Sequence, residues 1–278
     1  MKNNILILGG TGKTGRRIVQ RLTNKDLNIR IGSRGANPRF DWDDSTTWSG
    51  ALDGMDTVYI TYQPDLAVPG ALKSIQGLTK EAVRKGVQKL VLLSGKGERE
   101  AELCEEVIME SGLDFTIIRA SWFSQNFSES FFLEPIQNGT VALPQADVKV
   151  PYVDADDIAD VAVEVLLNDV HNGKIYQLTG SRFLTFREVI SEIAQETGRT
   201  ISFIPIGMEE YTQALKTMGV PEDYVWLIGY LFKEVLGNKA NQVITHDVEK
   251  VLKRKPKDFS KYLRETAATG IWNPKVEV

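Results

Sequence analysis

The sequence has 278 residues, of which 25% are charged and 42% hydrophobic, and a formal net charge of −4. This length allows one large domain with a smaller lobe, and the composition is typical of a soluble globular protein. The densest basic run, residues 253–257, is short and follows an expected helix. We therefore expect no direct nucleic-acid binding.

Cysteine and histidine are scarce in this chain. Cys104 is the single cysteine, which excludes an intrachain disulfide and a cysteine-rich metal site. His171 and His246 lie far apart in the sequence, so we expect no metal. The first apolar run stops at Gly9, and the longest, residues 224–236, is too short to span a bilayer. These features favour a cytoplasmic protein without a membrane segment.

A glycine-rich turn near the amino terminus carries the strongest functional signal. Residues 5–8 predict a buried strand and residues 16–22 a helix with one apolar face. Backbone N–H groups at a helix start are unpaired and lie at its positive end, and glycine lets phosphate oxygens approach the main chain. We therefore expect a dinucleotide pyrophosphate to bind at this turn, which consists of Gly9, Gly10, Thr11, Gly12, Lys13, Thr14 and Gly15.

The same turn permits two other interpretations. Gly12-Lys13-Thr14 suggests a nucleotide-triphosphate loop, but such a loop requires a further glycine where Ile7 stands. A mononucleotide kinase or hydrolase is therefore disfavoured. The other interpretation is a glycine turn that binds no ligand. The order of strand, turn and helix argues against it.

The end of the second predicted strand, residues 27–31, bears on the choice of cofactor. An acidic residue about twenty residues beyond the glycine turn would bind the ribose hydroxyls of NAD. Here Gly32 is followed by Ser33 and Arg34, whose hydroxyl and guanidinium suit the extra 2′-phosphate of NADP. NADP is favoured over NAD. The alternative for Arg34 is an exposed turn arginine.

Strands and helices alternate through the first half of the chain. Since each parallel crossover needs a connection as long as a helix, this order predicts an α/β fold with a Rossmann-type, doubly wound parallel sheet. The further strands are expected at residues 40–42, 57–61, 90–93 and 115–118, and the helices at 72–85 and 98–110.

The second half is less regular and mainly helical. We expect a nucleotide-binding core over residues 1–150, a return of the chain to that core around 151–180, and a smaller helical substrate lobe over 181–278. Helices are expected near residues 157–167, 186–197, 208–218, 225–236 and 247–253.

Several segments together resemble the NmrA-like branch of the atypical short-chain dehydrogenases/reductases. The resemblance covers most of the chain and extends to NADPH quinone reductases and ergot-alkaloid-pathway dehydrogenases. It implies a Rossmann domain with a small lobe, but the family contains both reductases and cofactor-sensing regulators. The matching segments are residues 5–15, 90–94, 111–119, 121–123, 151–159 and 176–180.

The resemblance also implies site residues. Gly9, Thr11, Gly12, Lys13 and Thr14 would surround the pyrophosphate, and Ser33 and Arg34 would meet the adenosine phosphate. Thr61, Tyr62 and Pro64 follow one strand and Ser94, Gly95 and Lys96 follow the next, so both groups would lie at the carboxyl edge of the sheet. Trp122, Phe123 and Asn126 would line the nicotinamide side, with ordinary packing as the alternative for the two aromatic residues.

The catalytic group is less clear from the sequence. Short-chain dehydrogenases use a Tyr-x-x-x-Lys pair, whose lysine lowers the pKa of the tyrosine. Ala101 and Glu105 stand at the approximate positions, and the acids around them are expected to form a solvated helix face. Ser94, Lys96 and Tyr152 are weak candidates for the proton donor.

These observations predict an NADPH-dependent oxidoreductase that transfers hydride to a small electron-poor substrate, such as a quinone, an imine or an activated carbonyl. Positioning and exclusion of water would be the protein's main contribution. One alternative is a non-catalytic NADP-binding regulator that acts through a protein partner. Another is an isomerase that keeps its cofactor.

Overall fold

The computed structural model describes residues 4–274, and the chain forms two compact units. The first consists of Met1–Ala120, Ala155–Leu178 and Asp247–Arg254, and the second of Ser121–Asp154, Thr179–His246 and Lys255–Val278. The expected core over 1–150 differs from this division. Residues 121–154 belong to the second unit because their strand β6 (Thr140–Leu143) pairs with β8 (Ser202–Pro205) of the same unit.

The first unit contains a six-stranded parallel sheet with the strand order β2-β1-β3-β4-β5-β7. This order confirms the predicted doubly wound α/β fold. Residues 40–42 do not form the expected strand, since Asp41 makes only an isolated bridge to Asp44. The strands are β1 (Asn4–Leu8), β2 (Asn28–Gly32), β3 (Thr57–Ile60), β4 (Lys89–Gly95), β5 (Asp114–Ala120) and β7 (Lys174–Leu178).

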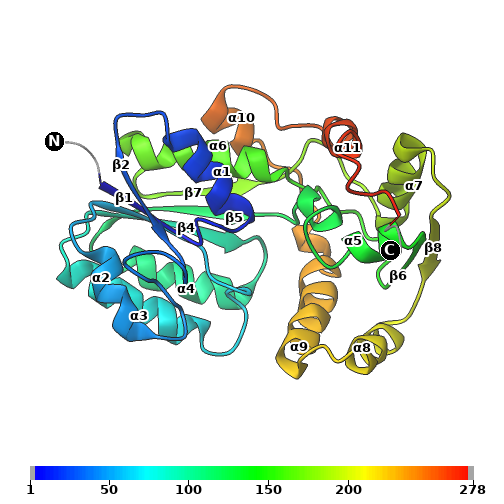
Figure 1. Cartoon of the computed structure of the whole chain (residues 1–278), viewed down its shortest axis with the longest axis horizontal. Coiled ribbons are helices and arrows are strands. Elements are labelled where there is room, and N and C mark those ends of the chain that lie inside the picture. Colours follow the sequence, from blue (N-terminus) through cyan, green and yellow to red (C-terminus); the bar gives the residue numbers. More distant parts are fainter. Residues whose placement is uncertain (1–3, 275–278) are drawn as a thin grey trace. The chain divides into compact units, whose positions relative to one another are not determined.

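Helices cover both faces of this sheet. In Figure 1, α2, α3 and α4 lie on one face, and α1, α6 and α10 lie on the other. Their bounds are α1 (Lys13–Leu22), α2 (Trp48–Leu52), α3 (Ala71–Arg84), α4 (Arg99–Met109), α6 (Ala155–Leu167) and α10 (Asp247–Leu252).

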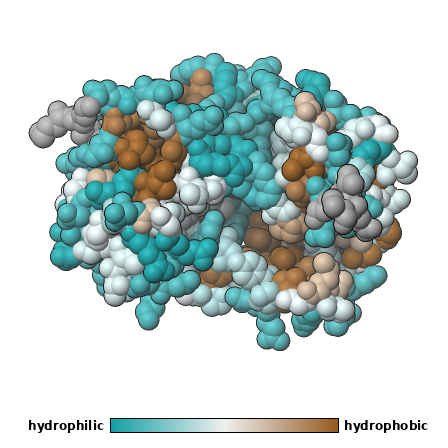
Figure 2. All heavy atoms as spheres, in the orientation of Figure 1, coloured by the Kyte–Doolittle hydropathy of each residue, from teal (hydrophilic) through white to brown (hydrophobic). Residues whose placement is uncertain are grey.

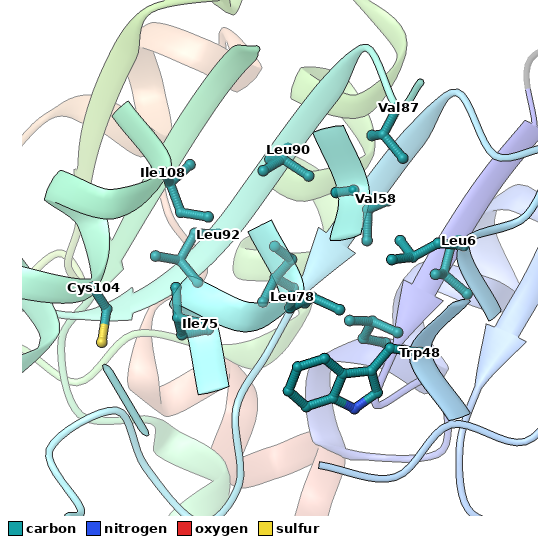
Figure 3. Close-up of a cluster of buried hydrophobic side chains, with 14 of the residues drawn as sticks. Leu6, Trp48, Val58, Ile75, Leu78, Val87, Leu90, Leu92, Cys104 and Ile108 are labelled. Carbon is teal, nitrogen blue, oxygen red and sulfur yellow. The ribbon is translucent and has the colours of Figure 1, made fainter. Parts of the chain in front are cut away.

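The core of the first unit explains why β1 reads as a continuous apolar run. A parallel strand covered by helices on both faces has no solvent side, and Ile5, Leu6, Ile7 and Leu8 are all fully buried. On the α2–α3–α4 face, Leu6, Val58 and Leu92 meet helix side chains such as Leu78 and Trp48 (Figure 3). Figure 2 shows hydrophobic residues gathered on the surface beside β1, β2 and α1.

The second unit is built around aromatic side chains. Its core includes Phe127, Phe132, Phe186, Phe232 and Trp272, each at most 1% exposed. Its expected helix at 225–236 is α-helical only as far as Tyr230 and continues as a π-helix, Leu231–Leu236. Its α-helices are α5 (Leu133–Gln137), α7 (Phe186–Thr197), α8 (Met208–Thr217), α9 (Glu222–Tyr230) and α11 (Phe259–Ala267).

Candidate functional site

The glycine turn after β1 is a tight structure that only glycine permits. Gly9 has φ +66° and its N–H donates to the Gly32 carbonyl over 2.9 Å, while the Gly12 N–H donates to the Gly9 carbonyl over 2.8 Å. A Cβ at Gly15 would lie 2.1 Å from the Gly9 oxygen. The start of α1 therefore packs directly on the turn, as a phosphate-binding loop requires.

The amino end of α1 is electrostatically suited to an anion. Gly12 is its N-cap residue and, as a glycine, supplies no capping side chain. Its first turn contains no acidic residue, so the positive end of the helix dipole is not neutralised there. The Tyr59 hydroxyl donates to Thr14 Oγ1 over 3.0 Å, and burial raises the pKa of Tyr59. The neutral Tyr59 hydroxyl thereby fixes the position of the Thr14 side chain.

The end of β2 places Ser33 and Arg34 on a short loop. Ser33 is half-buried and its carbonyl accepts from the Phe40 N–H over 3.0 Å, whereas Arg34 is exposed. The Asp43 N–H, the Arg39 guanidinium and, to a smaller extent, Arg34 lower the pKa of the Asp41 carboxyl. Arg34 and Arg39 therefore lie near this strand end together with the Asp41 carboxylate, which pairs with Arg39.

The end of β3 contacts the glycine turn. Thr61 Cγ2 lies 2.5 Å from the position that a Cβ on Gly9 would occupy, and Tyr62 is half-buried while Pro64 is exposed. The sequence interpretation did not single out Gln63. Its Nε2 lies 3.4 Å from the position of a Cβ on Gly12, the N-cap of α1. No signal in the local sequence pointed to this approach.

At the end of β4, the Ser94 hydroxyl is already engaged. It donates to Glu105 Oε1 over 2.5 Å, and Glu105 is fully buried. Arg119 Nε and Nη2 donate to Glu105 Oε2 over 2.9 and 2.6 Å. A buried carboxylate needs such pairing. Burial lowers the pKa of neighbouring Lys96, which is 8% exposed.

Two further carboxyl groups follow the same strands: Glu98 is buried and Asp65 is half-buried. Glu98 is 7% exposed, and its carboxyl occupies the space that a Cβ on Gly95 would fill, 2.0 Å from its Oε1. Burial, followed by the charge and hydrogen bond of Asp65, raises the pKa of Glu98, and burial also raises that of Asp65. The expected solvated face is therefore wrong for Glu98 and Glu105.

The remaining predicted residues belong to the second unit. The half-buried Trp122 ring lies 5.2 Å from Phe232 and 5.9 Å from Phe186, between ring centroids. Phe123 forms a bridge with Val153, and the half-buried Asn126 donates its N–H to the Phe123 carbonyl.

Tyr152 also lies in this second unit. It is 3% exposed, and its hydroxyl has no hydrogen-bond partner among residues 4–274. Burial raises its pKa well above the ordinary value. The structure thus brings the first-unit candidates to one sheet edge and Tyr152, Trp122, Phe123 and Asn126 into the other unit.

Two kinds of feature, a metal-binding cluster and a membrane-spanning helix, are absent from residues 4–274. Residues 4–274 contain no group of three or more His, Cys, Asp or Glu side chains arranged to hold a metal ion. Within the same residues, no helix has the length and apolar character needed to cross a membrane.

The chain is similar to several known proteins over most of its length. Prestalk A differentiation protein A from Dictyostelium discoideum is 30% identical over 95% of this chain and 93% of its own. Agroclavine dehydrogenase from Claviceps fusiformis is 26% identical over 96% of this chain and 98% of its own. The NADPH complex of an NADPH-dependent quinone oxidoreductase from Escherichia coli has a TM-score of 0.79 at 18% identity, covering 94% of this chain and 99% of that chain.

Two family models match the chain. Residues 9–169 match an NAD(P)H-binding family, and this range contains the glycine turn and the strand ends described above. Residues 100–263 match the NmrA-like family, which spans more than half of the chain. The chain therefore belongs to the NmrA-like family of NAD(P)H-binding proteins.

Proposed function

We propose that this protein is an NADPH-dependent oxidoreductase that transfers hydride to a small electron-poor substrate: a quinone, an imine or iminium ion, or an activated carbonyl. The observation that carries the proposal is the start of α1, whose N-cap is Gly12 and which packs on the glycine turn, where a Cβ at Gly15 would lie 2.1 Å from the Gly9 oxygen. Such a turn leaves backbone N–H groups for a pyrophosphate.

The residues present fit a dinucleotide. The turn would hold its pyrophosphate, Ser33 and Arg34 would hold the 2′-phosphate, and the ends of β3 and β4 would flank its middle. The exposed Arg34 favours NADP over NAD because a guanidinium pairs with a phosphate. The proposed cofactor residues are Gly9, Thr11, Gly12, Lys13, Thr14, Gly15, Ser33, Arg34, Thr61, Tyr62, Pro64, Ser94, Gly95 and Lys96.

When bound, NADPH supplies the hydride, and the chain supplies orientation and the proton. Ala101 and Glu105 stand where a Tyr-x-x-x-Lys pair would be, and Glu105 is held by Arg119. The Ser94 hydroxyl already donates a hydrogen bond to Glu105. We propose Lys96 as the proton donor. The Ser94 hydroxyl is engaged with Glu105, whereas the Lys96 ammonium carries a proton at Nζ and burial lowers its pKa.

The substrate class rests on relatives and on the second unit. The similarity to agroclavine dehydrogenase and to the quinone oxidoreductase supports a small, partly apolar acceptor. Trp122, Phe123 and Asn126 are proposed to contact it, since aromatic rings offer large apolar contact areas. The single, buried Cys104 suits a reducing cytoplasm.

The test is oxidation of NADPH against a panel of quinones, imines and activated carbonyls, followed by absorbance, with reduced product measured in equal amount. We expect turnover with at least one class. In Lys96→Gln we expect kcat to fall by a larger factor than the affinity for NADPH. Binding of NADPH without turnover on the panel would favour the regulator instead. Substrate conversion without net NADPH consumption would favour an isomerase.

A further inference from the structure

Trp42 is an aromatic side chain that the proposed function does not yet use. Its ring centroid lies 5.0 Å from Phe40, 5.9 Å from Trp48 and 4.7 Å from Tyr62. Phe40 and Trp48 are buried, whereas Trp42 and Tyr62 are half-buried. The Trp42 indole is therefore supported by neighbouring rings while part of its surface stays accessible.

Hydrogen bonds and close contacts connect Trp42 to the glycine turn. Its Nε1 donates to the Thr61 carbonyl at the end of β3 over 3.2 Å. Thr61 Cγ2 in turn approaches Gly9 so closely that a Cβ there would lie 2.5 Å away. The indole is thus anchored to the residue that touches the proposed pyrophosphate site.

On its other side, Trp42 is linked to the proposed 2′-phosphate site. It follows Asp41, whose carbonyl accepts from Trp48 Nε1 over 2.7 Å and whose carboxyl pairs with Arg39. The charge of Arg34 also lowers the pKa of that carboxyl. Arg34 and Trp42 lie on the same connection, between β2 and the 3-10 helix Ser45–Thr47, in which the Phe40 N–H donates to the Ser33 carbonyl over 3.0 Å. A partly accessible indole is thus connected to both expected anion sites, through Thr61 on one hand and through its own loop on the other.

The chemistry of NADPH identifies what lies between these two anions. Its adenosine carries the pyrophosphate on one ribose carbon and the additional phosphate on another, so the adenine base lies close to both. Bases stack well on aromatic rings because every base presents a π-face. We propose that the adenine ring of the dinucleotide stacks on Trp42, whose ring packs against Tyr62. This inference rests on the proposed function.

The decisive experiment measures binding to Trp42→Leu by calorimetry, using NADPH, 2′-phosphoadenosine 5′-diphosphate as an adenine-only probe, and reduced nicotinamide mononucleotide as a probe without adenine. From the usual contribution of one base–aromatic stack, we expect both adenine ligands to bind roughly 10- to 100-fold more weakly. Binding of the mononucleotide should not change. Trp42→Phe should keep most of the affinity.

Trp226→Leu is the matched control, because Trp226 is 47% exposed and lies on α9 of the second unit. It should leave all three affinities unchanged. A native affinity of Trp42→Leu for the adenine ligands would overturn the stacking proposal alone. Failure of the unmodified, folded protein to bind either NADPH or NADH would instead overturn the proposed function.

Fluorescence keeps the proposal testable if Trp42→Leu does not fold. The adenine-only probe should quench tryptophan emission of the unmodified protein, and this quenching should be reduced in Trp42→Phe, which retains an aromatic ring for packing. Equal quenching in both proteins would contradict stacking on Trp42.

Discussion

Both units have an apolar core, but they differ in the chemistry around the predicted site residues. At the strand ends of the first unit, buried polar groups are paired: Ser94 with Glu105, Glu105 with Arg119, and Tyr59 with Thr14. The second unit relies instead on ring packing around Phe127 and its neighbours. Paired polar groups fix charge and protons at defined positions, whereas rings fill space and tolerate apolar ligands. We therefore assign cofactor binding to the first unit and substrate contacts to the second.

Gly15→Ala is the most severe test of the first unit. The added Cβ would lie 2.1 Å from the Gly9 oxygen and 2.7 Å from its carbonyl carbon, so the helix must move away from the turn. We expect calorimetry to detect no NADPH binding and thermal unfolding to occur at a lower temperature. Gly50→Ala is the control, since its Cβ would meet only Pro38 at 3.7 Å. Normal binding by Gly15→Ala would remove the basis of the proposed cofactor site.

Trp272→Ala tests the second unit. Trp272 is fully buried and its Nε1 donates to the Phe127 carbonyl over 2.8 Å. Loss of such a large buried ring should lower the free energy of unfolding by about 3–5 kcal/mol, measured by urea denaturation. Trp226→Ala, at an exposed ring, should change it by far less. If the two units are as distinct as proposed, the folded Trp272→Ala protein still binds NADPH with native affinity.

Arg34→Ala tests the proposed preference for NADPH over NADH. Removing the guanidinium should weaken NADPH binding by about 10-fold or more, as expected for a charge-assisted hydrogen bond, while NADH binding stays nearly constant. The ratio of the two dissociation constants is the measurement. Lys25→Ala, an exposed cation on the turn that follows α1, serves as the control for net charge. An equal loss for both cofactors would refute a 2′-phosphate role.

Glu98→Gln should give the smallest effect, and its sign depends on pH. Because the pKa of Glu98 is raised in the folded state, folding takes up a proton above the ordinary carboxyl pKa, and stability falls as pH rises toward the folded value. A glutamine stays neutral and its amide can still donate to Asp65. We expect Glu98→Gln to gain about 1 kcal/mol relative to the parent protein at pH 8 and little at pH 4, in urea denaturation.

The exposed Glu106 on the same helix provides the comparison for that experiment. Glu106→Gln should alter stability little at either pH. A gain in Glu98→Gln that is the same at pH 4 and pH 8 would show that the carboxyl at position 98 is not held protonated by the surrounding acids Asp65, Glu100 and Glu105.

Much of the first unit could be predicted because its signals are local. The apolar run of β1, the glycine spacing and the apolar face of α1 are each contained within about one element, which is where periodicity is informative. The same reasoning failed for residues 40–42. Their apolar character comes from packing of Phe40 and Trp42 against Trp48, not from pairing in a sheet.

The buried acidic residues show why other features of the site could not be predicted from the sequence. An acidic run such as 98–106 is ordinarily solvated, and nothing within it indicates otherwise. Glu105 is buried because Arg119 reaches it from β5, and Glu98 because Gly95 leaves room for it. Likewise, β8 has four residues, mostly exposed, and ends in Pro205, so neither its length nor its pattern predicted a strand.

The chain passes between the units five times, after residues 120, 154, 178, 246 and 254. Consequently α10, which is made near the end of synthesis, completes a unit begun at the first residues, with Arg254 pairing with Asp157 on α6. A ribosome must therefore release almost the whole polypeptide before the earlier unit can close. A chain shortened before residue 247 would lack α10 and with it part of the first unit.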